Sequence, residues 1–329
     1  MAEANGKSEY LVGVDLGGTK IQVGVYDQRL SLIGSTKIST KSDRGTEAVL
    51  DRIARCVRDA VDECDLTLKQ IQSLGIGAPG AVDAEEGRVI FAPNLGWKDI
   101  PLRKELEKRL DLPVFVENDC NLCALGVHVV ELKGKPRHMI GLFIGTGIGA
   151  GLILNGELFT GHNHSAGEVG HMVILAGGPK CGCGNEGCFE AVASRTAIFK
   201  RIAAGIKDGE KTELVEMLGN DLKDLRSGDL RRAIRRKDKF TEKVVDDAAH
   251  YIGLAVGNLI NLFSPEVVAL GGGVIEALEQ EMMPIIIKAA VDHVLPGTMK
   301  GISIIPSKLG DNAGIAGAAV LAQRGLKGS

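Results

Sequence analysis

The same glycine-rich hairpin pattern occurs twice in the chain, and this repetition constrains the fold more than any other feature. YLVGVDLGGTKIQVGVYD at 10–27 and MIGLFIGTGIGAGLILNGEL at 139–158 both contain an apolar run, a turn of glycine and threonine, and a second apolar run. Short apolar runs rich in β-branched residues and bounded by glycine predict strands. Their repetition about 130 residues further on predicts two related α/β halves, each with a turn that can approach phosphate.

The remaining apolar patterns predict alternating strands and helices. Short apolar runs predict strands at 30–39, 73–79, 112–118, 265–275 and 302–306. Apolar residues at helical spacing predict helices at 45–64, 100–110 and 313–324, and helical patterns dominate 190–263. The fold class is therefore α/β, with mixed sheets, because the hairpins are antiparallel whereas βαβ segments are parallel. We expect a small domain of 1–117 plus 310–329 and a large domain of 118–309.

Composition excludes several classes of protein. The chain has 329 residues, 44% hydrophobic and 25% charged, which is typical of a globular protein long enough for two domains. A net charge of −3 favours neither nucleic acid nor anionic membrane as a partner. We find no signal-peptide pattern and no apolar stretch of the length that a bilayer requires. Seven cysteines without a signal peptide favour reduced thiols or metal ligands, and hence a cytoplasmic location. We also expect a homo-oligomer, either a dimer or a tetramer.

A basic run at 231–239 is the local exception to this charge balance. A solvated helix face explains such a run in most proteins. A site for a polyanion is the alternative that the sequence leaves open.

Three glycine-rich turns are candidates for binding a nucleotide. They comprise Asp15, Gly17, Gly18, Thr19 and Lys20; Gly145, Thr146 and Gly147; and Gly271 and Gly272. Glycine lets backbone N–H groups approach phosphate oxygens, and a carboxylate at the strand end can hold Mg²⁺ through water. The second turn is followed by an apolar strand rather than a helix, which argues against a dinucleotide-binding fold. For the first turn, a plain hairpin without a ligand remains an alternative interpretation, because the Walker spacing is absent.

Asn118 and Asp119 lie where a predicted strand ends and a helix begins. Ligands bind at such strand ends in α/β sheets. Asp119 could accept the proton of a substrate hydroxyl, and Asn118 could bond neighbouring hydroxyls. The alternative is that one of them only caps the helix.

His171, Cys181, Cys183 and Cys188 form a candidate metal site within the loop 160–190, which has no periodicity. Three thiolates and an imidazole complete a tetrahedral Zn²⁺ shell, so we expect a structural zinc that supplies folding energy to this loop. Glu168 and Glu190 flank the ligands, and carboxylates held in this way suit vicinal hydroxyls of a sugar. Solvated glutamates are the alternative. We interpret Cys120 and Cys123 as packing residues.

Together these motifs resemble the ROK family (repressors, open reading frames, kinases) over essentially the whole chain. The motifs are DLGGTK at 15–20, GIGAPGAV at 75–82, ENDCN at 117–121, IGTGIGAG at 144–151, AGEVGHM at 166–172 and CGCGNEGCFE at 181–190. The resemblance implies the two-domain actin-like (ribonuclease H-like) ATPase fold of hexokinases, whose domains close over ATP and sugar, with a zinc-stapled loop.

The resemblance also implies a role for each matching residue. Asp119 would be the general base, and the sugar contacts would be Gly80, Asn94, Asn118, Asp119, Glu168, His171 and Glu190. His171 would serve both sugar and zinc. The nucleotide and magnesium positions would be Asp15, Gly17, Thr19, Thr146, Gly147 and Gly272.

The activity that the resemblance implies is an ATP-dependent hexokinase, most similar to bacterial-type glucokinases, that phosphorylates the 6-hydroxyl of glucose with Mg-ATP. Alternatives of the same class are kinases for N-acetylmannosamine, N-acetylglucosamine, mannose or fructose, and a glucokinase that uses polyphosphate. A sugar-responsive repressor is the alternative of another class. We expect no DNA-binding role, because the first hairpin begins at Tyr10 and leaves no room before it for a helix-turn-helix.

Overall fold

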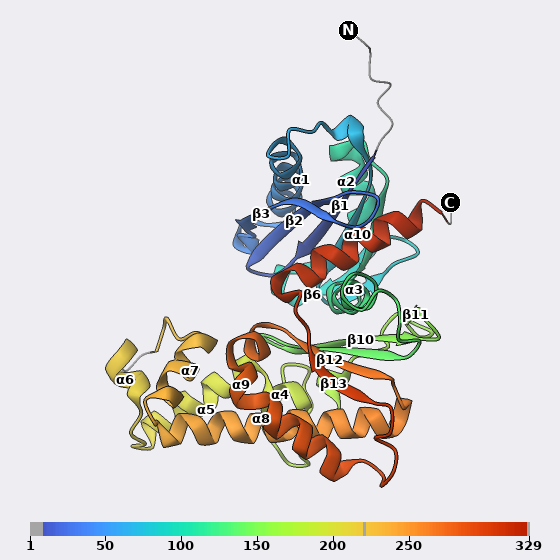
Figure 1. Cartoon of the computed structure of the whole chain (residues 1–329). Helices are drawn as coiled ribbons and strands as arrows, with labels where there is room; N and C mark the ends of the chain where they lie inside the picture. Colours follow the sequence, from blue (N-terminus) through green and yellow to red (C-terminus); the bar gives the residue numbers. More distant parts are fainter. Residues whose placement is uncertain (1–8, 220–221, 328–329) are drawn as a thin grey trace. The chain divides into compact units, whose positions relative to one another are not determined.

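The structure is a computed structural model that describes residues 9–219 and 222–327 (Figure 1). The chain forms two compact units. The first comprises the described residues of Met1–Arg137, Gly151–Gly167 and Asn312–Ser329, and the second comprises those of His138–Ala150 and Glu168–Asp311. These units place 118–137 and 151–167 with the first unit, whereas the sequence analysis assigned them to the large domain. The domain boundaries at 117/118 and 309/310 stay a prediction.

The first unit is built on a five-stranded mixed sheet. In sheet order, the strands are β3 (Leu32–Ser39), β2 (Lys20–Tyr26), β1 (Tyr10–Leu16), β4 (Ile71–Ala78) and β8 (Val114–Asn118). The pairs β1–β2 and β2–β3 are antiparallel, whereas β1–β4 and β4–β8 are parallel. The predicted mixture of hairpin and βαβ geometry is therefore confirmed.

The two faces of this sheet carry different helices (Figure 1). Val12 and Val14 of β1 belong to a core that they share with α1 (Thr46–Asp62) and α2 (Leu102–Leu110). Successive residues of a strand point to opposite faces, so Gly13 between them faces the other way. That face carries α10 (Ala313–Gly325), which also packs against α3 (Asp119–Gly126).

Glycines bring α10 into direct backbone contact with its neighbours. A Cβ on Gly13 would lie 2.0 Å from the Ile315 carbonyl oxygen, and a Cβ on Gly75 of β4 would lie 1.9 Å from that of Ala318. The crossing of α10 with α3 is equally close, because a Cβ on Gly317 would lie 1.7 Å from the Leu122 carbonyl oxygen. No other residue type fits these positions without moving a helix.

A small antiparallel sheet in the first unit was not predicted from the sequence. Its strands are β5 (Ala81–Asp83), β6 (Arg88–Ala92) and β7 (Trp97–Ile100). Gly80 immediately precedes β5, and Asn94 lies in the connection between β6 and β7. The strands are short, and Ile90 and Phe91 of β6 are both exposed, so no clear alternation of apolar and polar residues marks them.

A second five-stranded sheet contains the second glycine hairpin. In sheet order, its strands are β11 (Glu157–Phe159), β10 (Ile148–Leu154), β9 (Met139–Ile144), β12 (Val267–Gly271) and β13 (Ser303–Pro306). β12 is parallel to both β9 and β13, whereas β10 and β11 are antiparallel, so this sheet is mixed as well.

The predicted helical region of the second unit is confirmed. Its helices are α4 (Phe189–Ala193), α5 (Arg195–Lys207), α6 (Glu213–Leu218), α7 (Ser227–Arg235) and α8 (Lys239–Phe263), followed after β12 by α9 (Gly273–His293). α8 and α9 pack closely, because a Cβ on Gly253 would lie 2.5 Å from the Ala289 Cβ.

The basic run at 231–239 lies on α7 and the start of α8. Arg232 pairs with Asp229, and Lys239 pairs with Glu242 at 2.7 Å. Neighbouring carboxylates therefore satisfy part of this charge, as expected for a solvated helix face.

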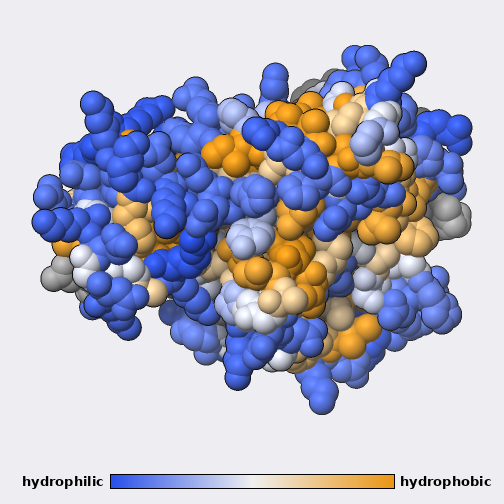
Figure 2. All heavy atoms as spheres, turned by 90° about the horizontal axis from the view of Figure 1, so that it is seen from below, coloured by the Kyte–Doolittle hydropathy of each residue, from blue (hydrophilic) through white to orange (hydrophobic). Residues whose placement is uncertain are grey.

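Apolar side chains are exposed on α8, on α9 and just beyond α9. Leu262 is 70% exposed and Leu295 is 67% exposed, and Ile287 and Val291 of α9 are exposed as well. Figure 2 views the protein from below, where α8 and α9 lie in Figure 1, and shows apolar side chains gathered on that face. Within 9–219 and 222–327, no helix has both the length and the apolar character needed to cross a membrane.

The contact between α10 and α3 leads to a first prediction. Gly317→Ala should lower the free energy of unfolding by about 1–3 kcal/mol or more, since the new methyl group must displace the backbone of α3. Gly228→Ala is the matched control, because a Cβ at this position in the first turn of α7 would meet nothing within 4 Å. It should be neutral or stabilising by up to about 1 kcal/mol. Urea unfolding of both variants is the measurement, and equal stabilities would contradict the packing described.

Candidate active site

The first glycine turn joins β1 to β2 in the first unit. The Gly17 N–H donates to the Lys20 carbonyl at 2.8 Å, which closes the turn. Thr40, buried at the end of β3, holds it from outside, since its hydroxyl donates to the Gly17 carbonyl at 2.7 Å and its N–H to the Thr19 carbonyl at 2.9 Å. Thr40 was not foreseen from the sequence. The turn is thereby fixed with the half-exposed Gly18 at its tip.

Asn94 lies beside this turn. A Cβ on Gly18 would lie 3.1 Å from the Asn94 Cβ, so the missing side chain is what allows their approach. The structure therefore brings together one predicted nucleotide residue and one predicted sugar residue.

Asp15 of β1 lies against the first turn of α10. A Cβ on Gly314 would come within 2.9 Å of the Asp15 Cγ, so glycine is required where the helix begins. Gln22, opposite Asp15 in the β1–β2 ladder, donates through Nε2 to the Asn312 Oδ1 at 2.8 Å and ties β2 to the same helix end. The N-terminus of a helix favours a carboxylate, and a carboxylate there can hold a hydrated Mg²⁺ ion.

The structure separates the roles of Asn118 and Asp119. Asn118 is the N-cap of α3, because its Oδ1 accepts the N–H groups of Cys120 at 2.9 Å and Asn121 at 3.1 Å. Asp119 is the first residue of the helix, and its Oδ1 accepts the Cys120 N–H at 2.8 Å. Asn121 is buried. The N-cap, which the sequence left open between the two residues, is therefore Asn118.

Two neighbours fix the orientation of Asn118. The amide Nδ2 donates to the Gly80 carbonyl at 3.1 Å, which joins two predicted sugar residues. Glu117 is buried, and its Oε1 accepts the Asn118 N–H at 2.8 Å and the Asn121 Nδ2 at 3.0 Å. Gly80 adopts φ +84°, and a Cβ there would lie 2.2 Å from the Phe91 carbonyl oxygen. The role of Glu117 in holding this strand end was missed, although the residue belongs to the ENDCN motif.

In the second unit, Glu190 lies directly against the second glycine turn. Its Oε2 accepts the Ile148 N–H at 2.9 Å. A Cβ on Gly147 would lie 2.2 Å from the same oxygen, so only glycine leaves room for the carboxylate. A predicted sugar residue and a predicted phosphate residue are thus in contact within this unit.

The start of α5 holds the other side of this turn. The Arg195 N–H donates to the Gly145 carbonyl at 3.0 Å, and its guanidinium donates to the Thr146 hydroxyl. The Thr196 hydroxyl donates to the Thr146 carbonyl at 2.7 Å. Arg195 and Thr196 were missed from the sequence, because the only local signal is Ser194, the N-cap of α5.

Gly272 places its backbone against the end of β9. It adopts φ +88°, and a Cβ there would lie 2.6 Å from the Ile144 carbonyl oxygen. A Cβ on Gly271 would lie 2.8 Å from the Phe143 ring. The predicted third glycine turn is confirmed as a strand-to-helix turn that exposes backbone beside the strand leading into the second turn.

The four predicted metal ligands are brought together in the second unit. The ligand atoms of His171, Cys181, Cys183 and Cys188 all lie within 4.8 Å of one another. Cys181 Sγ lies 3.7 Å from His171 Nδ1, and the sulfurs of Cys183 and Cys188 are 3.7 Å apart. Sulfurs bound tetrahedrally at about 2.3 Å from zinc are separated by about 3.8 Å. The cluster therefore fits a tetrahedral metal ion.

The thiols of the cluster differ in their pKa values. A hydrogen bond from the Asn185 backbone lowers the pKa of Cys183 to about 7. Burial, with the neighbouring thiols Cys183 and Cys181, raises the pKa of Cys188 to about 12. Three thiolates repel one another at this distance, and a divalent cation offsets that repulsion.

His171 faces two different groups. Its Nδ1 lies beside Cys181, whereas its Nε2 lies 3.9 Å from the Glu168 Oε2. Both Glu168 and His171 are exposed. The edge of the ring that carries Nε2 therefore remains accessible when Nδ1 binds a metal.

A family model described as the ROK family matches residues 11–325. The chain belongs to the ROK family. A glucokinase from Thermotoga maritima is 35% identical over 319 residues, which cover 97% of this chain and 98% of that protein. A xylose repressor from Caldicellulosiruptor bescii is 32% identical over 261 residues, which cover 79% of this chain and 65% of the repressor.

A solved ROK structure has the same fold. The ROK family glucokinase from Streptomyces griseus, in complex with glucose and AMPPNP, superposes with a TM-score of 0.85 at 30% identity, and the match covers 96% of this chain and 99% of that one. ROK membership and the mixed α/β fold class, both predicted from the sequence motifs, are therefore confirmed.

The contact between Gly147 and Glu190 leads to a second prediction. In Gly147→Ala the new methyl group should displace the Glu190 carboxylate, which can move, and remove its bond to the Ile148 N–H. Stability should fall by only about 1 kcal/mol, typical for one hydrogen bond. Amide hydrogen exchange at Ile148 should nevertheless become faster. Gly145→Ala is the control, since a Cβ there meets only the Gly147 carbonyl at 3.9 Å. Unchanged protection of Ile148 in Gly147→Ala would contradict the assigned contact.

Proposed function

We propose that the chain is an ATP-dependent hexokinase that phosphorylates the 6-hydroxyl of glucose. The observation that carries the proposal is the arrangement at the start of α3. Asn118 is the N-cap of this helix, so Asp119 is not required as its cap. Support comes from the glucokinase of Thermotoga maritima and from the glucose-bound ROK glucokinase of Streptomyces griseus.

Asp119 is the proposed general base. Its carboxylate accepts the proton of the sugar 6-hydroxyl as that oxygen forms a bond to the γ-phosphorus of ATP. The bond between that phosphorus and the β–γ bridging oxygen breaks, and ADP leaves with the electron pair. Positioning and charge stabilisation dominate such a reaction, and a general base typically contributes 10²–10⁴-fold.

The glycine turns are the proposed phosphate sites. The Gly17 and Gly145 N–H groups close the two turns, on the Lys20 and Gly147 carbonyls. The backbone N–H groups of Gly18, Thr19, Thr146 and Gly147 suit phosphate oxygens, with Lys20 as a nearby cation, and Gly271 and Gly272 suit the adenosine part. Asp15 would hold Mg²⁺ through water, and the ion would supply charge neutralisation on the phosphates. The position of Asp15 against the N-terminus of α10 supports this assignment.

The proposed sugar contacts are Gly80, Asn94, Asn118, Asp119, Glu168, His171 and Glu190. The Gly80–Asn118 hydrogen bond supports the first group, because it fixes the amide that would bond a hydroxyl. For His171, the separate environments of its two ring nitrogens support a dual role, with Nδ1 on the metal and Nε2 toward sugar.

The proposed metal is a structural zinc ion. Three cysteines and one histidine fill a tetrahedral shell, so the ion would have no open position for catalysis. The segment between His171 and Cys188 contains only turns and isolated bridges, such as Val173–Cys188 and Lys180–Glu186. Metal binding would supply the stability that such a segment cannot obtain from a core.

A cytoplasmic location and a homo-oligomer, either a dimer or a tetramer, complete the proposal. All seven cysteines lie in the described part of the chain and none forms a disulfide there, which supports a reducing compartment. The exposed apolar side chains of α8 and α9 support an assembly, because faces of this kind are commonly covered by a partner.

The zinc assignment gives a third prediction. Purified protein should contain about one zinc per chain, and Cys183→Ser should lose most of it, because the shell then lacks a thiolate. Residues 172–187 should become more sensitive to protease, and the thermal midpoint should fall. Cys64→Ser is the matched control, since Cys64 lies outside the cluster. Equal metal content and equal midpoints in the two variants would rule out a structural zinc.

The base assignment gives a fourth prediction. Asp119→Asn keeps the size of the side chain but removes its proton acceptor, so kcat should fall by about 10²–10⁴-fold with little change in glucose affinity. Asp111→Asn is the control and should keep full activity. Asp111 is exposed and has a left-handed backbone conformation, which asparagine tolerates. Steady-state kinetics and glucose titration measure both quantities. A near wild-type kcat in Asp119→Asn would place the base elsewhere.

A panel of hexoses tests the substrate. Glucose should have the highest kcat/KM, ahead of N-acetylmannosamine, N-acetylglucosamine, mannose and fructose, and ATP should exceed polyphosphate as donor. The similarity to a xylose repressor makes sugar-responsive regulation the second candidate. A regulator would bind sugar without transferring phosphate, so phosphate transfer in this assay decides between the two functions.

A further inference from the structure

The second glycine turn, 145–147, presents hydrogen-bond donors that have no acceptor in the part of the chain that the structure describes. The N–H groups of Thr146 and Gly147 donate to no atom of 9–219 and 222–327, and neither does the Thr146 hydroxyl. Thr146 is exposed and Gly147 is half-buried, so the turn is open to solvent. Adjacent donors of this kind suit a ligand that only accepts hydrogen bonds, such as a phosphate group.

The carbonyl groups of the turn determine where its N–H groups point. The Gly145 carbonyl accepts the Arg195 N–H at 3.0 Å, and the Thr146 carbonyl accepts the Thr196 hydroxyl at 2.7 Å. In a trans peptide group the N–H points opposite to the carbonyl. Because both carbonyls point to the start of α5, the N–H groups of Thr146 and Gly147 both point away from it. Successive N–H groups on one side of a turn form an anion-binding concavity.

Arg195 determines the orientation of the Thr146 hydroxyl. The guanidinium donates to the hydroxyl oxygen. A guanidinium cannot accept, whereas a hydroxyl has one hydrogen and two lone pairs. The side of the oxygen that faces Arg195 is therefore taken by a lone pair, and the hydroxyl hydrogen is directed elsewhere. The hydroxyl thus adds a further donor to the two N–H groups.

Arg195 also brings a positive charge to a turn that already has a negative neighbour. A Cβ on Gly147 would lie 2.2 Å from the Glu190 Oε2, and a carboxylate so close to the turn repels a phosphate. Among the described residues, Arg195 forms no ion pair, and its guanidinium bonds the turn itself. Its charge therefore offsets that of Glu190 where an anion would bind.

The capping of α5 explains only one of these contacts. The Arg195 N–H is one of the donors that the first turn of any helix leaves without a helical acceptor. The cap itself is Ser194, whose side chain accepts the Ala197 N–H at 3.1 Å. Neither the Arg195 guanidinium nor the Thr196 hydroxyl takes part in this cap. Their hydrogen bonds to Thr146 therefore need another explanation.

The first glycine turn has a similar arrangement. The Thr40 hydroxyl donates to the Gly17 carbonyl at 2.7 Å. The N–H of the next residue, Gly18, points opposite to that carbonyl and has no acceptor within the described chain. A threonine hydroxyl thus holds a carbonyl of each turn, although Thr40 follows a strand and Thr196 begins a helix. The recurrence favours a role that the two turns share.

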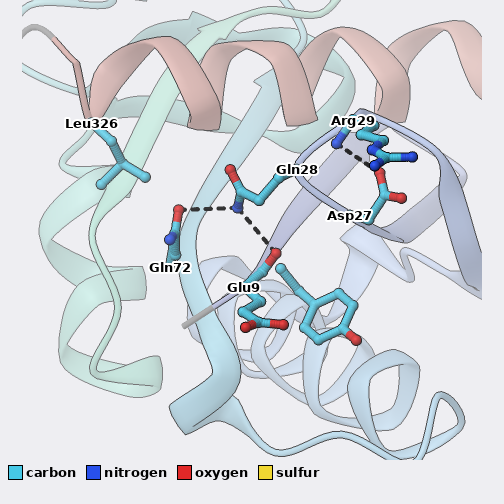
Figure 3. Close-up of a pocket in the computed structure, with 7 residues that line it drawn as sticks. Glu9, Asp27, Gln28, Arg29, Gln72 and Leu326 are labelled. Carbon is cyan, nitrogen blue, oxygen red and sulfur yellow. Dashed lines mark hydrogen bonds between the residues drawn. The ribbon is translucent and has the colours of Figure 1, made fainter. Parts of the chain in front are cut away.

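A hollow of about 910 Å³ in the first unit shows the opposite situation (Figure 3). Gln28 lies between Glu9 and Gln72, and its Nε2 donates to the Glu9 carbonyl at 3.0 Å and to the Gln72 Oε1 at 3.1 Å. The Arg29 N–H donates to the Asp27 Oδ1 at 2.8 Å. These donors are paired with acceptors of the same lining, so the volume of this hollow alone does not indicate a ligand.

We propose that Arg195 and Thr196 are positioning residues for the phosphoryl donor. They hold the turn 145–147 so that the N–H groups of Thr146 and Gly147 and the Thr146 hydroxyl donate to oxygens of one phosphate group of ATP. Hydrogen bonds to a charged acceptor are strong, and donors that are already oriented need no reorganisation when it binds. The inference rests on the proposed kinase function and adds the residues that orient its donor site.

Thr196→Val and Thr196→Ser test the hydroxyl. Thr196→Val keeps the shape of the side chain but releases the Thr146 carbonyl. Titration with Mg-AMPPNP should therefore give a dissociation constant about fivefold higher than in the wild type, as expected for one lost hydrogen bond. Thr196→Ser keeps the hydroxyl and should bind as the wild type does. In steady-state kinetics the KM for ATP should rise in Thr196→Val, whereas the KM for glucose should not.

Arg195→Met tests the guanidinium. The substitution keeps an unbranched apolar side chain but removes the cation and its donors. The affinity for Mg-AMPPNP should fall about tenfold or more, as expected for hydrogen bonds to charged groups. Lys200→Met is the matched control, because it removes the same charge from an exposed position on the same helix. Its affinity should equal that of the wild type.

Amide NMR signals locate the effect within the turn. Mg-AMPPNP should shift the signals of Thr146 and Gly147 in the wild type. Thr196→Val should reduce the shift at Gly147 more than at Thr146, because the Arg195 N–H still holds the Gly145 carbonyl. A general loss of stability would not distinguish these two neighbouring amides.

Three results would overturn the inference. They are equal AMPPNP affinities of Thr196→Val and Thr196→Ser, equal affinities of Arg195→Met and Lys200→Met, and a Gly147 signal that AMPPNP does not shift in the wild type. Failure of the proposed function looks different, since the wild type would then bind AMPPNP at Gly147 and transfer phosphate to no hexose. A wild type that binds no AMPPNP would overturn both.

Discussion

Backbone contact between α10 and its neighbours is the constraint on which the first unit depends. Glycines at 13, 75 and 317 leave no side chain at the closest approaches, so that the backbone of the helix lies directly against two strands and α3. Such contacts define position more sharply than interdigitated side chains do, because they leave no rotamer to adjust. Two chemical groups depend on them. The start of α10 meets Asp15, and the packed α3 carries Asp119 at its first residue.

The second unit is organised by a different chain of contacts, from the cysteine cluster to the second glycine turn. Cys188 is a predicted metal ligand and the N-cap residue of α4, and Glu190 follows in the first turn of that short helix. The Glu190 carboxylate then accepts the Ile148 N–H beside Gly147. A metal bound to Cys188 would therefore hold a carboxylate against the second glycine turn.

Much of the fold could be predicted because the decisive signals are local. Apolar runs bounded by glycine identified the strands of both hairpins, and the Cys-His pattern identified four candidate ligands whose ligand atoms lie within 4.8 Å of one another. The sheet of β5, β6 and β7 could not be predicted, because its strands are short and Phe91 is exposed. Arg195 and Thr196 were missed for a different reason. They act on Thr146 through contacts across about 50 positions of sequence, and spacing carries no information about such contacts.

The ambiguity between Asn118 and Asp119 shows what a structure adds to a motif. Both residue types cap helices well, so the sequence could not separate a cap from a base. A helix needs one N-cap, and here the Asn118 side chain accepts two N–H groups of the first turn while Gly80 and Glu117 fix its orientation. Asp119 therefore stands one position further on, inside the helix. The N-terminus of a helix stabilises negative charge, and the ionised carboxylate is the form that a general base requires. The structure thus assigns the N-cap to Asn118, and the role of Asp119 as a base stays a proposal.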